Sequence, residues 1–291
     1  MLQYDEVAIK EIHSWKNPEP SFIDNLMAHI RKPINSVTAM LPDAPESIAN
    51  VLKKSIIGIV SACNDAAHYS TQPGLIYKEF RDNSHKSVYS HKDIQKLDLE
   101  HVDRVVGYLA AKYKGIALVE GAATGSAGIF GIPVDIAALI TLNLRAISEY
   151  ATYYGFDTRS QEERLFALNI LSLASAPSDA SKIVAMSQLI KIAETAAQKK
   201  AWKILEQHYF VQISQKIAES LGRKLTKAKL AQIAPVTGSF VGAGFNAYYT
   251  SKVCDAAYYL YRERFLAKKY GSKIIDECVS PADSFEPETV D

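Results

Sequence analysis

Three charged side chains in a long apolar stretch, Asp135, Arg145 and Glu149, are the candidates for catalysis. Residues 116–144 contain only two charged side chains, Glu120 and Asp135, before Arg145 and Glu149 follow. Charged groups in an apolar setting are typical of a functional polar cluster. On one helix, however, the Asp135 and Glu149 carboxylates lie about 21 Å apart along the axis. They therefore cannot act as a pair on one bond.

The spacing of these residues also has a structural interpretation, which we favour. Asp135 follows Pro133 by two residues. At this position a carboxylate interacts favourably with the positive end of the helix dipole. Arg145 and Glu149 are neighbours at i,i+4 on a helix. Asp135 and Arg145 are ten residues apart on the helix, which places them about 80° apart around its axis. They therefore cannot pair with each other, and each needs a partner on another segment. The predicted polar cluster comprises Glu120, Asp135, Arg145 and Asn246.

Other motifs for chemistry have the wrong context. VGAGFNA at residues 241–247 resembles a dinucleotide fingerprint, but no second strand ending in an acid follows it. The histidines His85, His91 and His101 have irregular spacing, which favours a solvated polar loop over a metal site. The sequence therefore predicts neither a cofactor nor a metal.

Small residues recur every four positions in two segments, which indicates close helix packing. On a helix this spacing makes a smooth stripe that lets another backbone approach. The predicted helix-packing glycines are Gly121, Gly125, Gly128, Gly238 and Gly242. Two interpretations stay open: a buried helix pair in a soluble domain, or a wedge that enters or lies on a membrane.

The second of these segments has basic flanks that suit a lipid surface. Residues 230–251 carry no charge, but their polar side chains and Pro235 make them a poor spanning helix. Lys and Arg beside such a segment are attracted to anionic lipid, although they also suit ordinary helix ends. The predicted membrane-facing basic residues are Arg223, Lys224, Lys227, Lys229 and Lys252.

Helical periodicity dominates the chain, and no alternating strand pair is evident. We predict an all-α fold: one multi-helix domain with the two glycine-rich segments packed centrally. Helices are expected over residues 133–154, 161–175 and 252–270, with Gly155 as a C-terminal cap. The expected divisions are an N-terminal helical segment (1–74), a main helical domain (75–272) and an acidic disordered tail (273–291).

The composition limits the cellular location and the classes of partner that we expect for this protein. The 33 basic and 32 acidic side chains nearly cancel, so no overall field favours nucleic acid. The N-terminus lacks the apolar core of a signal peptide, which predicts a cytoplasmic protein. Cys63, Cys254 and Cys278 are far apart and are expected to be reduced thiols.

The order of the segments resembles the EcsC protein family of bacteria over residues 77–270. The resemblance is carried by EGAATGSAGIFGIPVDIAALITLNLRAISEYATYYGFD, then EERLFALNILSLAS, then the IAPVTGSFVGAGFNAYYTSKVCDAAYYLYRERFL ending. The family takes its name from a protein encoded beside an ABC transporter, which implies a setting at the bacterial envelope. It supplies no agreed activity and no catalytic residues.

These observations together favour a non-enzymatic accessory protein at the cytoplasmic face of a bacterial membrane. Its expected partners are the lipid surface, which it would contact peripherally, or a membrane protein such as an ABC transporter. The alternatives are a soluble, hydrolase-like enzyme that uses the polar residues around Asp135 and Arg145, and a purely soluble scaffold. The oligomeric state is left open.

Overall fold

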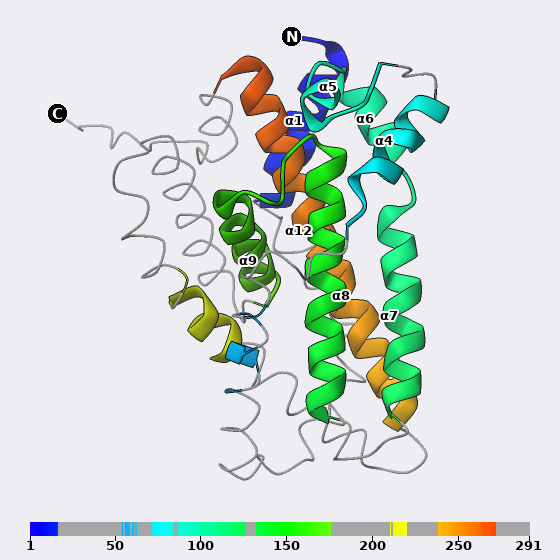
Figure 1. Cartoon of the computed structure of the whole chain (residues 1–291), viewed down its shortest axis with the longest axis vertical. Helices are drawn as coiled ribbons and strands as arrows, with labels where there is room; N and C mark the ends of the chain where they lie inside the picture. Colours follow the sequence, from blue (N-terminus) through cyan, green and yellow to red (C-terminus); the bar gives the residue numbers. More distant parts are fainter. Residues whose placement is uncertain are drawn as a thin grey trace, which may run out of the picture.

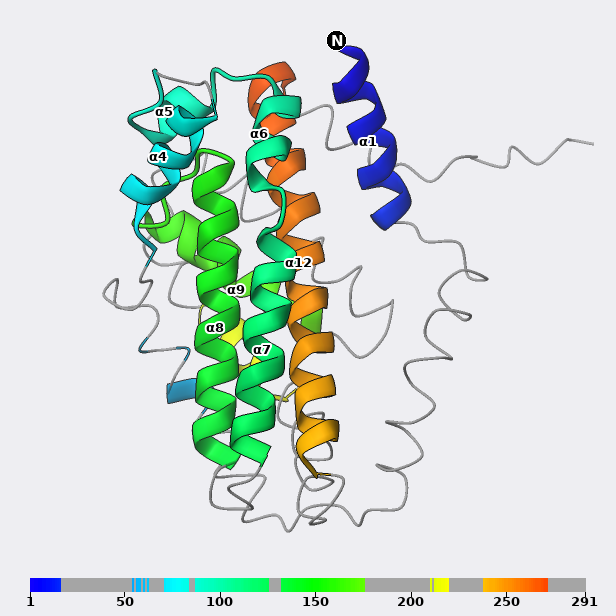
Figure 2. The same cartoon turned by 90° about the vertical axis from the view of Figure 1, so that its right-hand side faces the viewer.

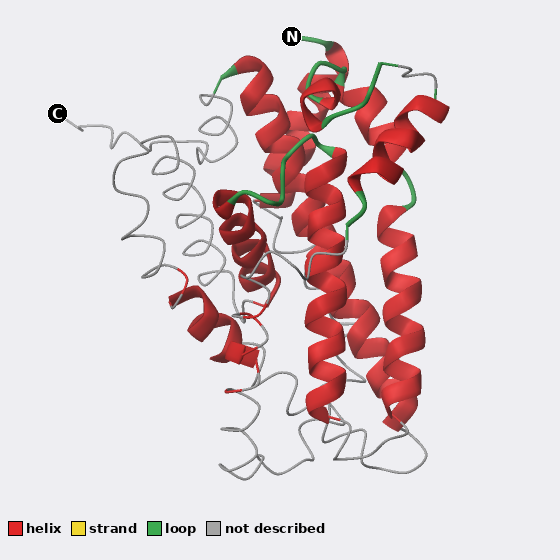
Figure 3. Ribbon diagram, viewed as in Figure 1, coloured by secondary structure: helices red, strands yellow, loops and turns green. Residues whose placement is uncertain are grey.

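The computed structural model describes residues 1–16, 71–83, 87–125, 132–175 and 238–271, together with parts of 54–62 and 210–219. Within these residues every regular element is a helix and no strand occurs (Figure 3). The predicted all-α class is confirmed. The predicted acidic tail, residues 273–291, lies outside the described residues.

Three long helices pack side by side in a column: α7 (Leu109–Gly125), α8 (Ile132–Tyr153) and α12 (Gly238–Tyr270) (Figures 1 and 2). Helix α12 has 33 residues, which is about 50 Å at 1.5 Å per residue. Helix α7 runs antiparallel to the other two, and its contact with α12 is the most extensive between any two described elements.

Small side chains on α7 suit this close contact. Its buried positions recur every four residues, at Leu109, Tyr113, Ala117 and Gly121, so one narrow face meets the column. Gly121 is buried on this face, but the predicted packing role of the five glycines stays a prediction. Gly128 lies outside the described residues, and the surroundings of the remaining three are not described: Gly125, Gly238 and Gly242.

Helix α8 begins and ends within one residue of the predicted bounds, 133–154. Pro133 lies in its first turn, and Gly155 lies two residues after its last residue, Tyr153, with a φ of +77°. The amide of Phe156 donates to the Ala151 carbonyl at 2.8 Å, and that of Gly155 to the Thr152 carbonyl at 3.0 Å. This is the paired hydrogen bonding of a Schellman cap. Helix α9 (Gln161–Ser175) also has its predicted bounds and packs against α8 and α12.

The upper end of the column is surrounded by shorter helices: α1 (Gln3–Lys16), α4 (Pro73–Asp82), α5 (His91–Ile94) and α6 (Leu99–Val106) (Figure 1). Helix α1 packs against α12 and α6, although it belongs to the predicted N-terminal segment. The helical periodicity of residues 97–114 is interrupted at Gly107, whose φ of +34° ends α6 before α7 begins.

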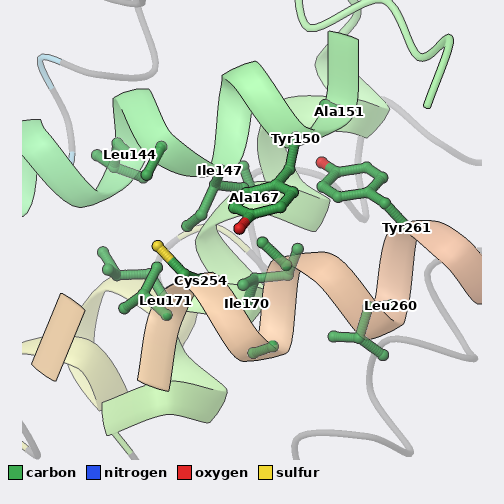
Figure 4. Packing of buried hydrophobic residues seen from close by; sticks show 14 of the residues in the cluster. Leu144, Ile147, Tyr150, Ala151, Ala167, Ile170, Leu171, Cys254, Leu260 and Tyr261 are labelled. Atoms are coloured by element: carbon green, nitrogen blue, oxygen red, sulfur yellow. The ribbon is translucent and has the colours of Figure 1, made fainter. Parts of the chain in front are cut away.

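The core lies between α8, α9 and α12, where aliphatic side chains from all three helices interlock (Figure 4). Cys254 lies fully buried among them as a free thiol, whereas Cys63 and Cys278 lie outside the described residues. The side chain of Tyr150 hydrogen-bonds with Cys254, and burial raises the pKa of the Cys254 thiol to about 12. Thiolate chemistry is therefore suppressed at this position.

The cap of α8 generates a stability prediction. A Cβ atom at Gly155 would lie 2.6 Å from the backbone oxygen of His91, in a backbone conformation that L-residues rarely adopt. Gly155→Ala should therefore lower the free energy of unfolding by about 1–3 kcal/mol, measured by denaturant titration.

Gly115→Ala is the matched control, because Gly115 lies exposed within α7 and no atom would contact its Cβ within 4 Å. That variant should be neutral or more stable by about 0.5–1 kcal/mol. Equal effects at the two glycines would contradict the assignment of Gly155 as an obligatory cap.

Candidate functional site

The outward side of α7 is apolar where a soluble helix normally carries charge. Ile116, Leu118 and Val119 are 37%, 52% and 67% exposed. The neighbouring exposed positions of the helix are also apolar or glycine. We define the α7 apolar face as Gly115, Ile116, Leu118, Val119, Ala122 and Ala123. A contiguous exposed patch of this kind typically marks an interaction site.

The same end of α8 and α12 is also nearly free of charge. We call residues 115–125, 132–144 and 238–251 the charge-poor half of the column; they lie together at its lower end (Figures 1 and 2). They contain only two charged residues, Glu120 and Asp135. None of the described helices combines the length and hydropathy needed to cross a membrane.

The two acids of the charge-poor half are sheltered. Asp135 is 2% exposed, and its Oδ1 accepts a hydrogen bond from Asn246 Nδ2 at 3.3 Å across the α8–α12 contact. Glu120 is partly buried, and this burial raises the pKa of its carboxyl. Asp135 is therefore withdrawn from the apolar surface, and Glu120 is partly withdrawn from it.

The predicted polar cluster is divided into two places. Asp135 and Asn246 are together, as proposed, but Arg145 lies about 15 Å further along α8. Its Nε is 3.5 Å from Glu149 Oε1 on the same helix, because the exposed guanidinium reaches a carboxylate one turn away. The expectation that Arg145 finds its ion-pair partner on another segment is corrected accordingly. Lys112 of α7 bonds the other oxygen of Glu149 at 2.7 Å.

A second basic group lies between α7 and α12. Lys252 and Lys114 both act electrostatically on the Asp255 carboxyl, where they oppose the rise in its pKa that burial causes. The Lys252 ammonium lies 5.8 Å from the ring centre of Tyr248. Lys252 is thus the one predicted membrane-facing residue that the structure places. The other four lie outside the described residues: Arg223, Lys224, Lys227 and Lys229.

A buried ion network at the upper end was not predicted from the sequence. Arg262 is 2% exposed and bonds Glu11 of α1 at 2.8 Å and Asp103 of α6 at 2.9 Å. Asp103 also accepts hydrogen bonds from the hydroxyls of Tyr4 and Tyr154, at 2.9 and 2.6 Å. The sequence contains a signal for this network. Arg262 occupies a position on the face of α12 that is otherwise apolar, and a charge there needs a buried partner.

A second buried pair joins α9 to α12. Arg264 donates two hydrogen bonds to the Glu163 carboxylate, at 2.7 and 2.5 Å. Its guanidinium lies 4.2 Å from the ring centre of Phe156 and 4.1 Å from that of Phe166. This geometry fixes the arginine between helices. Among the described residues no group of three or more His, Cys, Asp and Glu side chains is arranged to hold a metal ion.

The division of the polar cluster predicts unequal effects of two substitutions. Asp135→Ala removes a buried acceptor and should lower the free energy of unfolding by about 1–3 kcal/mol. Arg145→Ala should cost no more than about 0.5 kcal/mol, because the arginine side chain is 48% exposed and Glu149 keeps Lys112. Urea titration of both variants checks this, and equal losses would contradict it.

Comparison with known proteins gives a consistent result. The sequence model of the EcsC protein family matches residues 6–266, which includes helix α1 as well as the column. The chain is 25% identical over 269 residues to the uncharacterized protein YdbA of Bacillus subtilis (strain 168), covering 90% of this chain and 92% of YdbA. It is 25% identical over 227 residues to protein EcsC of the same organism, covering 78% and 83%.

No solved structure matches the chain significantly. The family match nevertheless spans most of the sequence, from the first turn of α1 to the last turns of α12. The helices that it covers are those that form the column and its upper end. This protein therefore belongs to the EcsC protein family.

Proposed function

We propose that this protein is a non-enzymatic accessory protein that binds peripherally to the cytoplasmic face of a bacterial membrane. The observation that carries the proposal is the α7 apolar face, on which Leu118 and Val119 are more than half exposed. Each side chain is already partly buried, so removing the rest of it from water contributes about 1–2 kcal/mol. Two or three such residues supply the affinity of a reversible membrane contact.

The basic residues beside this face support the same proposal. Lys112 and Arg145 are about half exposed at the edge of the charge-poor half. Each Lys or Arg near an anionic membrane surface contributes about 1 kcal/mol of attraction. Because salt screens this attraction, binding should weaken as ionic strength rises.

The buried charges support a structural role rather than catalysis. Arg262 and Arg264 are each held by carboxylates of other helices. Such pairs fix helices relative to each other, and removing one partner is costly. An accessory role beside an ABC transporter is the setting that the family resemblance implies.

The proposal predicts that one apolar side chain of α7 controls membrane binding. Leu118→Glu should weaken binding of the full chain to phosphatidylglycerol-containing liposomes by about tenfold or more, because it replaces apolar burial with a charge. Flotation at low and high salt is the assay. Thermal melting should show little change, because Leu118 is a surface residue.

Leu75→Glu is the matched control. Leu75 is 58% exposed on α4 at the other end of the column, against 52% for Leu118. It should float as the parent does. If the parent chain does not float with anionic liposomes at low salt, the proposal is wrong.

A further inference from the structure

Four cations lie at one level around the column. Lys112 and Arg145 are both ion-paired with the Glu149 carboxylate, and Lys114 and Lys252 both act electrostatically on the Asp255 carboxyl. Lys112 and Lys114 are two residues apart, which is about 3 Å along the axis. The two groups therefore lie at the same height. We call Lys112, Lys114, Arg145 and Lys252 the basic collar.

The collar carries more positive than negative charge toward solvent. Its two acids are more sheltered than its outer cations: the Glu149 side chain is 8% exposed, against 49% and 48% for Lys112 and Arg145. Burial also raises the pKa of Asp255. Long basic side chains at such a boundary can hold their charge at an interface while their stems cover apolar surface.

The charge-poor half below the collar has a definite depth. From Gly115 to the end of α7 is 11 residues, or about 16 Å, and α12 from Gly238 to Ser251 is about 21 Å. The hydrocarbon core of a bilayer is about 30 Å thick, and the bilayer is about 40–45 Å thick with its headgroup regions, so one leaflet is about 15 Å of hydrocarbon and about 20–22 Å in all.

From this match we infer that the charge-poor half inserts into a single leaflet of an anionic membrane, with the basic collar at the level of the lipid phosphates. This inference rests on the proposed function and adds to it the inserting surface, its depth and the lipid group that it recognises. The Asp135–Asn246 pair enters the leaflet shielded between α8 and α12. Helices α1, α4, α5 and α6 stay outside the bilayer at the opposite end (Figure 1).

Depth is tested with two single labels on the full chain. A fluorophore is placed at Ala122→Cys, on the α7 apolar face, or at Tyr108→Cys, which is 90% exposed above the collar. Cys63 and Cys278 are replaced by Ser in both, and buried Cys254 is kept. Vesicles contain equal phosphatidylglycerol and phosphatidylcholine with spin-labelled acyl chains.

The label at residue 122 should be quenched by the acyl chains and protected from aqueous iodide, whereas the label at residue 108 should show the reverse. If the protein floats but both labels stay open to iodide, the inference is wrong and the proposed function stands. If the protein does not float, both are wrong. If the parent chain forms a dimer without lipid and Leu118→Glu makes it monomeric, the α7 apolar face binds a second copy of the chain, and the inference is also wrong.

The collar is tested by Lys112→Gln with Lys252→Gln, which leaves Glu149 with Arg145 and Asp255 with Lys114. Binding to the anionic vesicles should fall about 10- to 30-fold, with a smaller change on pure phosphatidylcholine. The control removes two exposed cations at the upper end, Lys78→Gln with Arg104→Gln, and should change binding by roughly twofold at most. Equal losses for the two pairs would show general charge attraction and overturn the collar.

Discussion

The rest of the structure depends on helix α12, whose two halves differ in charge and need different partners. Its residues from Gly238 to Ser251 carry no charge, whereas seven charged side chains follow before Tyr270. A single helix cannot bury both halves in the same way, because buried charges need ionic partners and apolar faces need apolar cover. In the upper half, Arg262 and Arg264 form ion pairs with carboxylates of α1, α6 and α9. The lower half packs against α7 and α8 and leaves an apolar face outside.

This division of charge separates an ion-paired end of the described column from an apolar end. Around Arg262 the carboxylates of Glu11 and Asp103 hold two other helices in fixed positions. Burial raises the pKa of Asp103, and the neighbouring arginine opposes that rise. At the lower end the contacts are mainly between small and apolar side chains. Such a surface can exchange water for lipid without breaking an ion pair, and this exchange is the role that we propose for it.

Local signals allowed much of the fold to be predicted, while long-range pairs were missed. Pro133 and Gly155 fix the ends of α8 through backbone chemistry, which a single sequence displays. The break at Gly107 depends on a left-handed backbone that ordinary periodicity does not reveal. Asp135 contacts Asn246, one of the cluster residues named from the sequence. Arg145 instead lies near Glu149 on its own helix, because an exposed arginine side chain can adopt a rotamer that reaches the nearest carboxylate. The partners of Arg262 lie more than 150 residues away in sequence, where spacing gives no guidance.

The central claim is that the charge-poor half of the column enters one leaflet. Neutron reflectometry of the full chain on a supported anionic bilayer measures this directly, because it gives the distribution of protein along the membrane normal. The account predicts protein within the hydrocarbon of the proximal leaflet to a depth of about 15 Å, with most of the protein outside the headgroups. Protein confined to the aqueous side, or distributed through both leaflets, would contradict it.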